Sequence, residues 1–172
     1  METNSVVFFN DGKYPELTHK PIIAAWQISN PENIGNLIRL ADNLGAEEVY
    51  ILGNDFRFRM SSIKKTAGLS FSHVRLSFIA PEDFFEQLRP DFQLVAIETS
   101  ENSVNLFTVK LPEKIIFILG NEKNGLPDEI LKKCSLRAHI PMTGKCKSMN
   151  VSHALAVAMF EWQRQMLFFT YI

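Results

Sequence analysis

The sequence from His139 to Phe160 reads HIPMTGKCKSMNVSHALAVAMF, which predicts a short strand, a polar loop and a strongly apolar helix. The strand ends at Pro141, because proline lacks the amide hydrogen that a ladder position needs. Asn150 is predicted to cap the helix, because its side-chain oxygen can accept from a free N–H group of the first turn. Ser148 and Asn150 therefore lie beside unpaired backbone donors, where polar ligands are readily held. By itself, the stretch predicts either a helix buried behind a binding site or a core helix with an ordinary cap.

The composition is typical of one soluble globular domain. The chain has 172 residues, 46% of them hydrophobic and 22% charged, which suits a single well-buried core. The formal net charge is -1, so any nucleic-acid binding must come from a local basic patch. Cys134 and Cys146 lack metal-ligand spacing, and the N-terminus lacks a secretory signal. The apolar run 154–160 is far shorter than the roughly 20 residues that span a bilayer. We therefore expect a cytoplasmic protein without a metal or a membrane contact.

Strands and helices alternate along the chain, which predicts an α/β fold: a single domain with a largely parallel sheet flanked by helices. The predicted strands are residues 22–28, 48–52, 74–79, 93–98, 114–119 and 137–140. The predicted helices are one that starts within 29–33 and stops at Gly45, and residues 81–88, 127–134 and 151–169. Residues 53–72 are expected to be less regular. We expect residues 1–20 to form an N-terminal lead and residues 21–172 to form the domain.

Three loops follow predicted strands, where open α/β sheets bind their ligands. They are residues 29–33, 120–126 and 141–150. None of them carries the Gly-Lys-Ser/Thr of a P-loop or the Gly-x-Gly-x-x-Gly of a dinucleotide site. A general nucleotide-binding α/β protein is therefore disfavoured. Each loop taken singly could be an ordinary turn, whereas the three together indicate one shared ligand site.

The same loops contain three recognisable motifs. The first is Asn33-Ile-Gly-Asn-Leu-Ile-Arg39, and the second is Leu119-Gly-Asn-Glu-Lys-Asn-Gly-Leu126. The third is Ile140-Pro-Met together with Ser148-Met-Asn-Val-Ser. In order and spacing these motifs resemble those of the SpoU/TrmH-type RNA 2′-O-ribose methyltransferases of the SPOUT superfamily, over about residues 22–165. The segment from Lys65 to His73 also resembles, less specifically, the branch that methylates the wobble ribose of tRNA.

The resemblance implies properties that composition and spacing do not show. It implies a C-terminal deep trefoil knot, a homodimer, and S-adenosylmethionine bound bent in the knot as the methyl donor for a ribose 2′-hydroxyl of RNA. The cofactor-binding residues that it implies are Ile97, Glu98, Thr99, Gly120, Ile140, Met142, Ser148 and Met149. The catalytic residues that it implies are Asn33, Arg39, Glu122, Ser148 and Asn150.

Arg39 is the central catalytic residue by this motif match, with Asn33 orienting it. A ribose hydroxyl is a poor nucleophile, so the site must orient it and assist the loss of its proton. The family's arginine is proposed to be the general base, but a guanidinium keeps its proton in proteins and suits the bidentate binding of phosphate. We therefore expect Arg39 to be essential, without assigning the proton to it.

Two basic segments are candidates for RNA contact. Phe56-Arg-Phe-Arg59 alternates aromatic and basic side chains, which can stack on bases and neutralise phosphates. The alternative, that these phenylalanines point into the core, is equally compatible with the sequence. The candidate RNA-binding residues are Arg57, Arg59, Lys64, Lys65, Lys145 and Lys147. Cys146 has no catalytic partner in the sequence, and His153 is expected inside the fold or at an interface.

The target and the oligomeric state are also predicted. We expect no additional RNA-recognition domain before residue 21 and no basic C-terminal arm, which favours tRNA. Ribosomal RNA and a catalytically inactive RNA-binding relative remain as alternatives. The helix 151–169 is apolar on more than one face, and a two-fold dimer would cover the second face. Alternatively, the lead or the tail 167–172 would cover it in a monomer.

Overall fold

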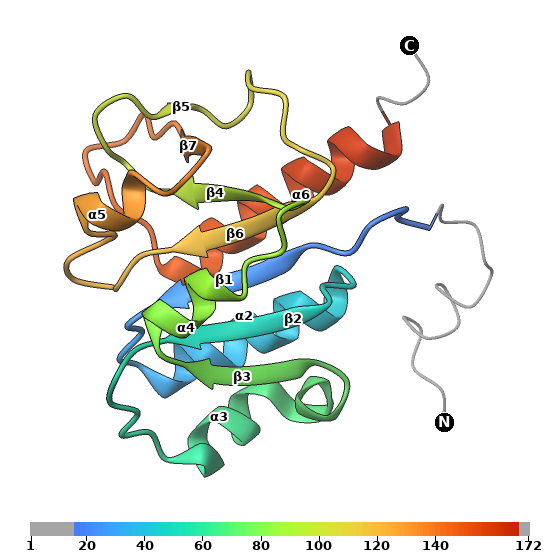
Figure 1. Ribbon diagram of the computed structural model, residues 1–172, viewed down its shortest axis with the longest axis vertical. Coiled ribbons are helices and arrows are strands. Elements are labelled where there is room, and N and C mark those ends of the chain that lie inside the picture. Colours follow the sequence, from blue (N-terminus) through green and yellow to red (C-terminus); the bar gives the residue numbers. More distant parts are fainter. Residues whose placement is uncertain (1–15, 169–172) are drawn as a thin grey trace.

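A single parallel sheet forms the centre of the computed structural model, which describes residues 16–168 (Figure 1). Its seven strands lie in the order β3-β2-β1-β6-β4-β7-β5 and all neighbouring pairs are parallel. The strands are β1 (Ile22–Trp26), β2 (Glu48–Leu52), β3 (Arg75–Ile79), β4 (Gln93–Ile97), β5 (Val104–Asn105), β6 (Ile115–Leu119) and β7 (Leu136–His139). The prediction of an α/β fold with a parallel sheet is confirmed. Most of the predicted lead, residues 1–15, and the tail residues 169–172 lie outside the described residues.

The sheet is buried on both faces, as the uninterrupted apolar strands predict. In β1, Ile23 and Ala25 face one apolar cluster, whereas Ile22, Ala24 and Trp26 face another. The same alternation runs along β6, so the two central strands divide the core into two layers.

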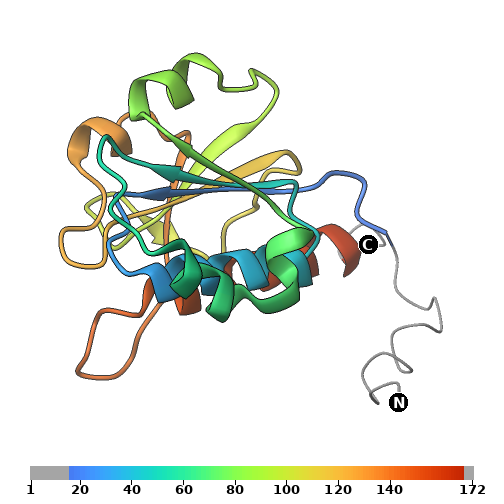
Figure 2. The ribbon, with the colours of Figure 1, turned by 90° about the horizontal axis from the view of Figure 1, so that it is seen from below.

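Helices cover both faces (Figure 2). The helices are α2 (Pro31–Asn43), α3 (Met60–Ala67), α4 (Pro81–Glu86), α5 (Asp128–Leu131) and α6 (Val151–Phe168), with a 3-10 helix, η1 (Gly68–Ser72). Figure 2 shows α2, α3 and α6 on one face of the sheet and α4 and α5 on the other. The two core clusters agree with this division, since α2, α3 and α6 contribute to the first and α4 and α5 to the second.

Helix α3 was not predicted, because residues 53–72 were expected to be less regular. Its buried residues are Ile63 and Ala67, and its start at Arg59 has no side-chain cap. It packs directly on α2 at Gly35, where an added Cβ would touch Thr66 and lie 2.9 Å from the carbonyl oxygen of Ile63. The helix therefore depends on a close contact with α2, which the local sequence of α3 does not predict.

Three other predictions need correction. The strand predicted at 22–28 ends at Trp26, because Gln27 takes a left-handed backbone with φ of 46°. The helix predicted at 127–134 contains only Asp128–Leu131. Strand β5 was not predicted; it has two residues and, within the described part of the chain, pairs with β7 alone.

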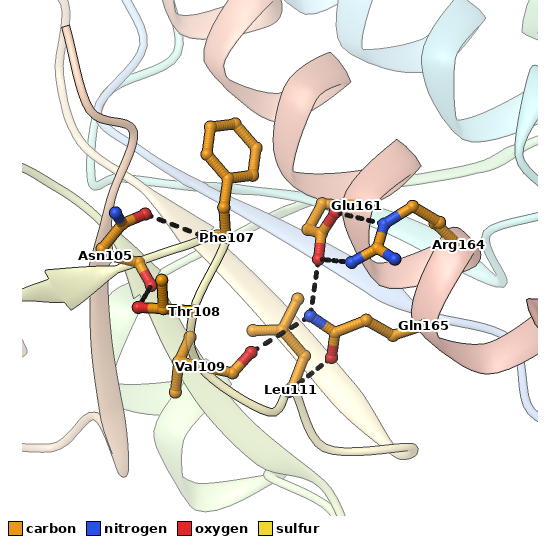
Figure 3. Close-up of polar contacts among 8 residues, drawn as sticks. All are labelled: Asn105, Phe107, Thr108, Val109, Leu111, Glu161, Arg164 and Gln165. Carbon is orange, nitrogen blue, oxygen red and sulfur yellow. Dashed lines mark hydrogen bonds and ion pairs between the residues drawn. The ribbon is translucent and has the colours of Figure 1, made fainter. Parts of the chain in front are cut away.

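The segment from Asn105 to Pro112, here called the strap, runs from β5 towards β6 across the C-terminal half of α6 (Figure 3). The side chain of Gln165 donates to the carbonyl of Val109 over 3.0 Å and accepts from the amide of Leu111 over 2.9 Å. Trp162 donates to the carbonyl of Pro112 over 2.9 Å. The strap is thus fixed to α6 by side chains that satisfy its backbone groups.

Helix α6 begins as predicted directly after Asn150, whose side-chain oxygen accepts from the amide and hydroxyl of Ser152. One face, with Leu155 and Trp162, is buried in the core, whereas Phe160 is 56% exposed. His153 is exposed in the chain, so of its two predicted locations the interior is excluded and an interface stays a prediction. Across residues 16–168, no helix is both long and apolar enough to cross a bilayer.

Candidate active site

A cavity of about 640 Å³ opens at the carboxyl ends of β4, β6 and β7, beside the starts of α2 and α6. It is called the motif cavity below, because all three motif loops line it. Its lining includes all eight predicted cofactor-binding residues: Ile97, Glu98, Thr99, Gly120, Ile140, Met142, Ser148 and Met149. Asn33, Glu122 and Asn150 line it as well. Segments that are far apart in the sequence therefore meet where the topology of a parallel sheet predicts a ligand site.

Glu122 connects the second motif to the loop before α2. Its carboxylate accepts from the backbone amides of Ser29 and Asn30, each over 3.0 Å, and from the Ser29 hydroxyl over 3.1 Å. The side chain of Asn33 donates to the same carboxylate over 2.9 Å. Partial burial raises the pKa of Glu122, but hydrogen bonds from Ser29, Asn33 and Asn30 outweigh it, so the pKa lies below its usual value. The carboxylate is thus an ionised acceptor that fixes two loops.

Asn33 extends this network to the third motif. The residue is buried, with 5% exposure, and its side-chain oxygen accepts from the Asn150 amide over 3.0 Å. Asn150 in turn caps α6 through its own oxygen. A continuous chain of hydrogen bonds therefore runs from Glu122 through Asn33 and Asn150 to the first turn of α6, and one side chain from each motif takes part.

The second motif forms a closed loop around two glycines. Asn121 and Gly125 exchange backbone hydrogen bonds of 3.1 and 3.0 Å. Gly125 has a φ of 65°, and a Cβ there would lie 2.7 Å from the carboxylate of Glu98. A Cβ on Gly120 would overlap the backbone of Gly125. Glu98 also accepts from the Leu126 amide over 2.9 Å, so it holds the end of the loop. These glycines let the backbone close on itself at the wall of the motif cavity.

Arg39 is the one predicted catalytic residue that does not line the motif cavity. It is exposed on α2, six positions after Asn33, and its guanidinium lies 4.0 Å from where a Cβ on Gly68 would be. The structure therefore brings four of the five predicted catalytic residues together and leaves Arg39 on the surface near η1.

All six predicted RNA-binding residues are exposed, in two separate groups. Lys145 and Lys147 belong to the loop before α6, where Lys147 lines the motif cavity and donates to the carbonyl of Met142. Arg57, Arg59, Lys64 and Lys65 lie in the connection from β2 and in α3. Hydrogen bonds to Ser148 hold the pKa of the Cys146 thiol below its ordinary value.

Several residues of the motif cavity were not predicted from the sequence. Ser29, Asn30 and Asn121 belong to the predicted ligand loops, and their polar side chains next to motif residues were the available signal. His139 also lines the cavity, and its ring nitrogen lies 3.0 Å from the Ser103 hydroxyl. No sequence signal identifies this pair, because β5 was not predicted. Within residues 16–168, no group of three or more His, Cys, Asp or Glu side chains could hold a metal ion.

The chain is similar in sequence and fold to known RNA methyltransferases. The chain is 28% identical over 153 residues to the tRNA (guanosine(18)-2′-O)-methyltransferase of Escherichia coli, covering 89% of this chain and 65% of that protein. A crystal structure of an AdoMet-bound rRNA methyltransferase from Sinorhizobium meliloti has a TM-score of 0.77 and 28% identity, covering 91% of this chain and 60% of the other. A structure described as giving insights into the 2-OH methylation of C/U34 on tRNA has a TM-score of 0.76 and 28% identity, covering 86% of this chain and 96% of the other.

The chain thus spans less than two thirds of the length of the first two relatives and nearly all of the third. It matches the SpoU rRNA Methylase family over residues 20–160, a range that contains the three motif loops. The resemblance inferred from the motifs is confirmed: the chain belongs to the SpoU rRNA Methylase family.

Proposed function

We propose that this protein transfers a methyl group from S-adenosylmethionine to a ribose 2′-hydroxyl of RNA, with tRNA as the favoured substrate. The observation that carries the proposal is the motif cavity, where all eight predicted cofactor-binding residues and four of the five predicted catalytic residues meet. The three relatives described above, which act on tRNA or rRNA by name, support the same reaction class.

The motif cavity fits the proposed cofactor in size and chemistry. Its volume of about 640 Å³ lies within the ~300–1,000 Å³ that is usual for small-molecule sites. Ile97, Leu119 and Ile140 supply apolar walls, and the loop closed at Gly120 and Gly125 brings backbone groups to the edge. These residues would hold the adenosyl part, and Ser148 and Met149 would lie at the entrance from α6. When bound, the cofactor supplies an electrophilic methyl group on a positively charged sulfur.

The residues of the chain would position the substrate and supply a positive charge for its phosphate. Glu122 has donors on both carboxylate oxygens, so its role is to fix the loop at Ser29 and the start of α2 rather than to take a proton. Asn33 and Asn150 extend this bracing to α6. Orienting a hydroxyl towards an electrophile can account for a large part of a rate enhancement. Arg39 would bind the phosphate next to the reacting ribose, the contact for which a guanidinium is suited.

Two observations support a homodimer in which the partner supplies Arg39. Arg39 lies outside the motif cavity of its own chain. Large apolar side chains are also exposed near α6: Phe107 is 48%, Phe160 56% and Phe168 63% exposed. A second copy would bury them and could place an arginine at the cavity of its partner.

The trefoil knot belongs to the same proposal. The hydrogen bonds of Trp162 and Gln165 to the strap hold α6 against this earlier segment of chain, and a knot requires these two segments to cross. In the knotted arrangement, the loop 141–150 and α6 would be threaded under the strap.

We also propose that the protein is cytoplasmic, where its free thiols, Cys134 and Cys146, would stay reduced.

Methylation assays with purified RNA test the proposal. The protein is incubated with S-adenosylmethionine and either unfractionated tRNA or rRNA from a strain that lacks the protein. Ribose methylation is then mapped by resistance of the RNA backbone to alkaline cleavage. New resistance at one tRNA position supports the proposal, and resistance only in rRNA supports the alternative substrate. No methylation of either RNA, together with no cofactor binding by calorimetry, contradicts the proposed activity.

A further inference from the structure

A second cavity, of about 420 Å³, lies beside the motif cavity. It is lined at the carboxyl ends of β1 and β2 by Gln27, Ile28, Ser29, Ile51, Leu52, Gly53, Asn54, Asp55, Phe56, Arg57 and Phe58. Ser29 lines both cavities, and Glu122 holds its backbone amide and its hydroxyl. The two cavities are therefore neighbours on one edge of the sheet, separated by a loop that the motif network fixes.

Aromatic side chains form one wall of the second cavity. The Phe56 ring packs on the backbone of Gly53, where an added Cβ would lie 3.2 Å from a ring carbon. The Phe78 ring lies behind it, with the centroids 5.2 Å apart and the planes at 64°. Phe58 lies next to Phe78, with centroids 6.0 Å apart. Phe56 nevertheless remains 36% exposed. The ring is thus held in place by its neighbours without being covered.

The rim of the second cavity is polar and bordered by cations. Gln27 and Asn54 are exposed, and their amides can both donate and accept hydrogen bonds. Arg57 is paired with Asp55 at 2.7 Å, but their side chains are 87% and 60% exposed. An ion pair this exposed contributes little stability, so a phosphate can compete for the arginine. The exposed cations Arg59, Lys64 and Lys65 follow in the chain.

We propose that the second cavity receives an unpaired nucleobase of the RNA whose ribose enters the motif cavity. A base offers a π-face to Phe56 and a hydrogen-bonding edge to Gln27 and Asn54, and single-stranded RNA is recognised in this way. The backbone of the same nucleotide would meet Arg57. Because Ser29 lines both cavities, the two sites are close enough for neighbouring parts of one RNA strand to occupy them together. This inference rests on the proposed function and adds that the substrate is read as an unpaired loop.

The substitution Phe56→Leu in the full-length protein tests the inference. Leucine keeps an apolar side chain at the wall but has no aromatic face. The probes are a fluorescein-labelled RNA hairpin with an unpaired loop and a fully paired duplex with the same stem, each measured by fluorescence anisotropy. We expect the variant to bind the hairpin at least about fivefold more weakly, which is the lower end of the effect of losing one stacked base. Duplex affinity and S-adenosylmethionine affinity are expected to stay at the wild-type values.

The matched control is Phe92→Leu. Phe92 is partly buried just before the amino end of β4, whereas the second cavity lies at the carboxyl ends of strands, and the Arg89 guanidinium is 3.8 Å from the Phe92 ring centroid. This control is expected to bind hairpin and duplex as the wild type does. A second measurement does not depend on any variant: hairpins with 5-iodouridine in the loop are photocrosslinked to the wild type, and the modified peptide is identified. Crosslinks within residues 51–58 support the inference.

The outcomes separate this inference from the proposed function. Unchanged hairpin affinity in Phe56→Leu, an equal loss for the duplex, or crosslinks confined to other segments overturns the base site while methylation by the wild type stands. A wild type that neither binds S-adenosylmethionine nor methylates RNA removes the proposed function, and the base site is then overturned with it.

Discussion

The side-chain amide of Asn150 donates a 3.0 Å hydrogen bond to Asn33, although the two residues are 117 positions apart. Asn33 uses its other end to donate to Glu122 over 2.9 Å. A primary amide can donate and accept at once, so Asn33 can join an acceptor on one side to a donor on the other. An aspartate, a leucine or an alanine at this position cannot do both at neutral pH.

The substitution Asn33→Asp is expected to destabilise the protein by about 2–3 kcal/mol at pH 7, because it removes a donor and adds a buried negative charge beside Glu122. Urea unfolding followed by circular dichroism measures the effect. The loss should shrink as the pH falls, since a protonated aspartic acid can donate to Glu122 again. The control is Asn36→Asp on the same helix, which should change stability little. Equal losses in both variants would contradict the bridging role of Asn33.

Glu122→Gln is expected to lower stability by about 1 kcal/mol at pH 7, because one acceptor oxygen becomes a donor facing other donors. The pH dependence follows from the lowered pKa of Glu122. Its contribution is present above the ordinary carboxyl pKa of 4.5 and is lost as the pH falls through the folded-state pKa. The difference between wild type and variant should therefore decrease in acid. The exposed Glu129→Gln is the control, and a difference that stays constant down to acid pH would refute the explanation.

Arg39→Ala is expected to reduce methyl transfer by more than about tenfold, a change of roughly 1.4 kcal/mol in the activation barrier, while cofactor affinity stays nearly unchanged. The reason is that Arg39 lies outside the motif cavity. Arg89→Ala, which removes an arginine paired with Glu47, serves as control. Mixing Arg39→Ala and Asn150→Ala chains should restore part of the activity if the partner supplies the arginine. Proven mixed dimers without activity would argue against sharing, and an Arg39→Ala enzyme with nearly full activity would remove the residue from the mechanism.

Gly35→Ala is expected to destabilise the protein by about 1–3 kcal/mol, since the added methyl group would press on Thr66 and the carbonyl of Ile63. Thermal unfolding measures the change. Gly144→Ala is the control, because a Cβ placed there would have no atom of residues 16–168 within 4 Å apart from its chain neighbours. If the two alanine variants melt at the same temperature, α2 and α3 do not pack as closely as described.

The sequence predicted most strands and the three loops that meet at the motif cavity, because both depend on local patterns. Five-residue apolar runs such as β6 are bounded by turn residues, and parallel strands leave their loops on one edge. It did not predict α3, because that helix is short, uncapped and stabilised by the close approach at Gly35. It also did not predict β5, whose two residues are fixed by pairing with β7. The hydrogen bond between Asn33 and Asn150 needs the folded topology, so the motifs identified both residues but not their contact.

The position of β1 in the sheet has a consequence for synthesis on the ribosome. Strand β1 pairs with β2 on one side, but its other edge pairs with β6, where Ile22 faces Ile116. Ribosomes add roughly 5–20 residues per second, so β6 emerges several seconds or more after β1. During that interval β1, which is entirely apolar, has one unpaired edge. Until residues 115–119 emerge, the nascent chain therefore exposes an unpaired apolar strand edge in the middle of its future sheet, which is a hazard for pairing with other chains.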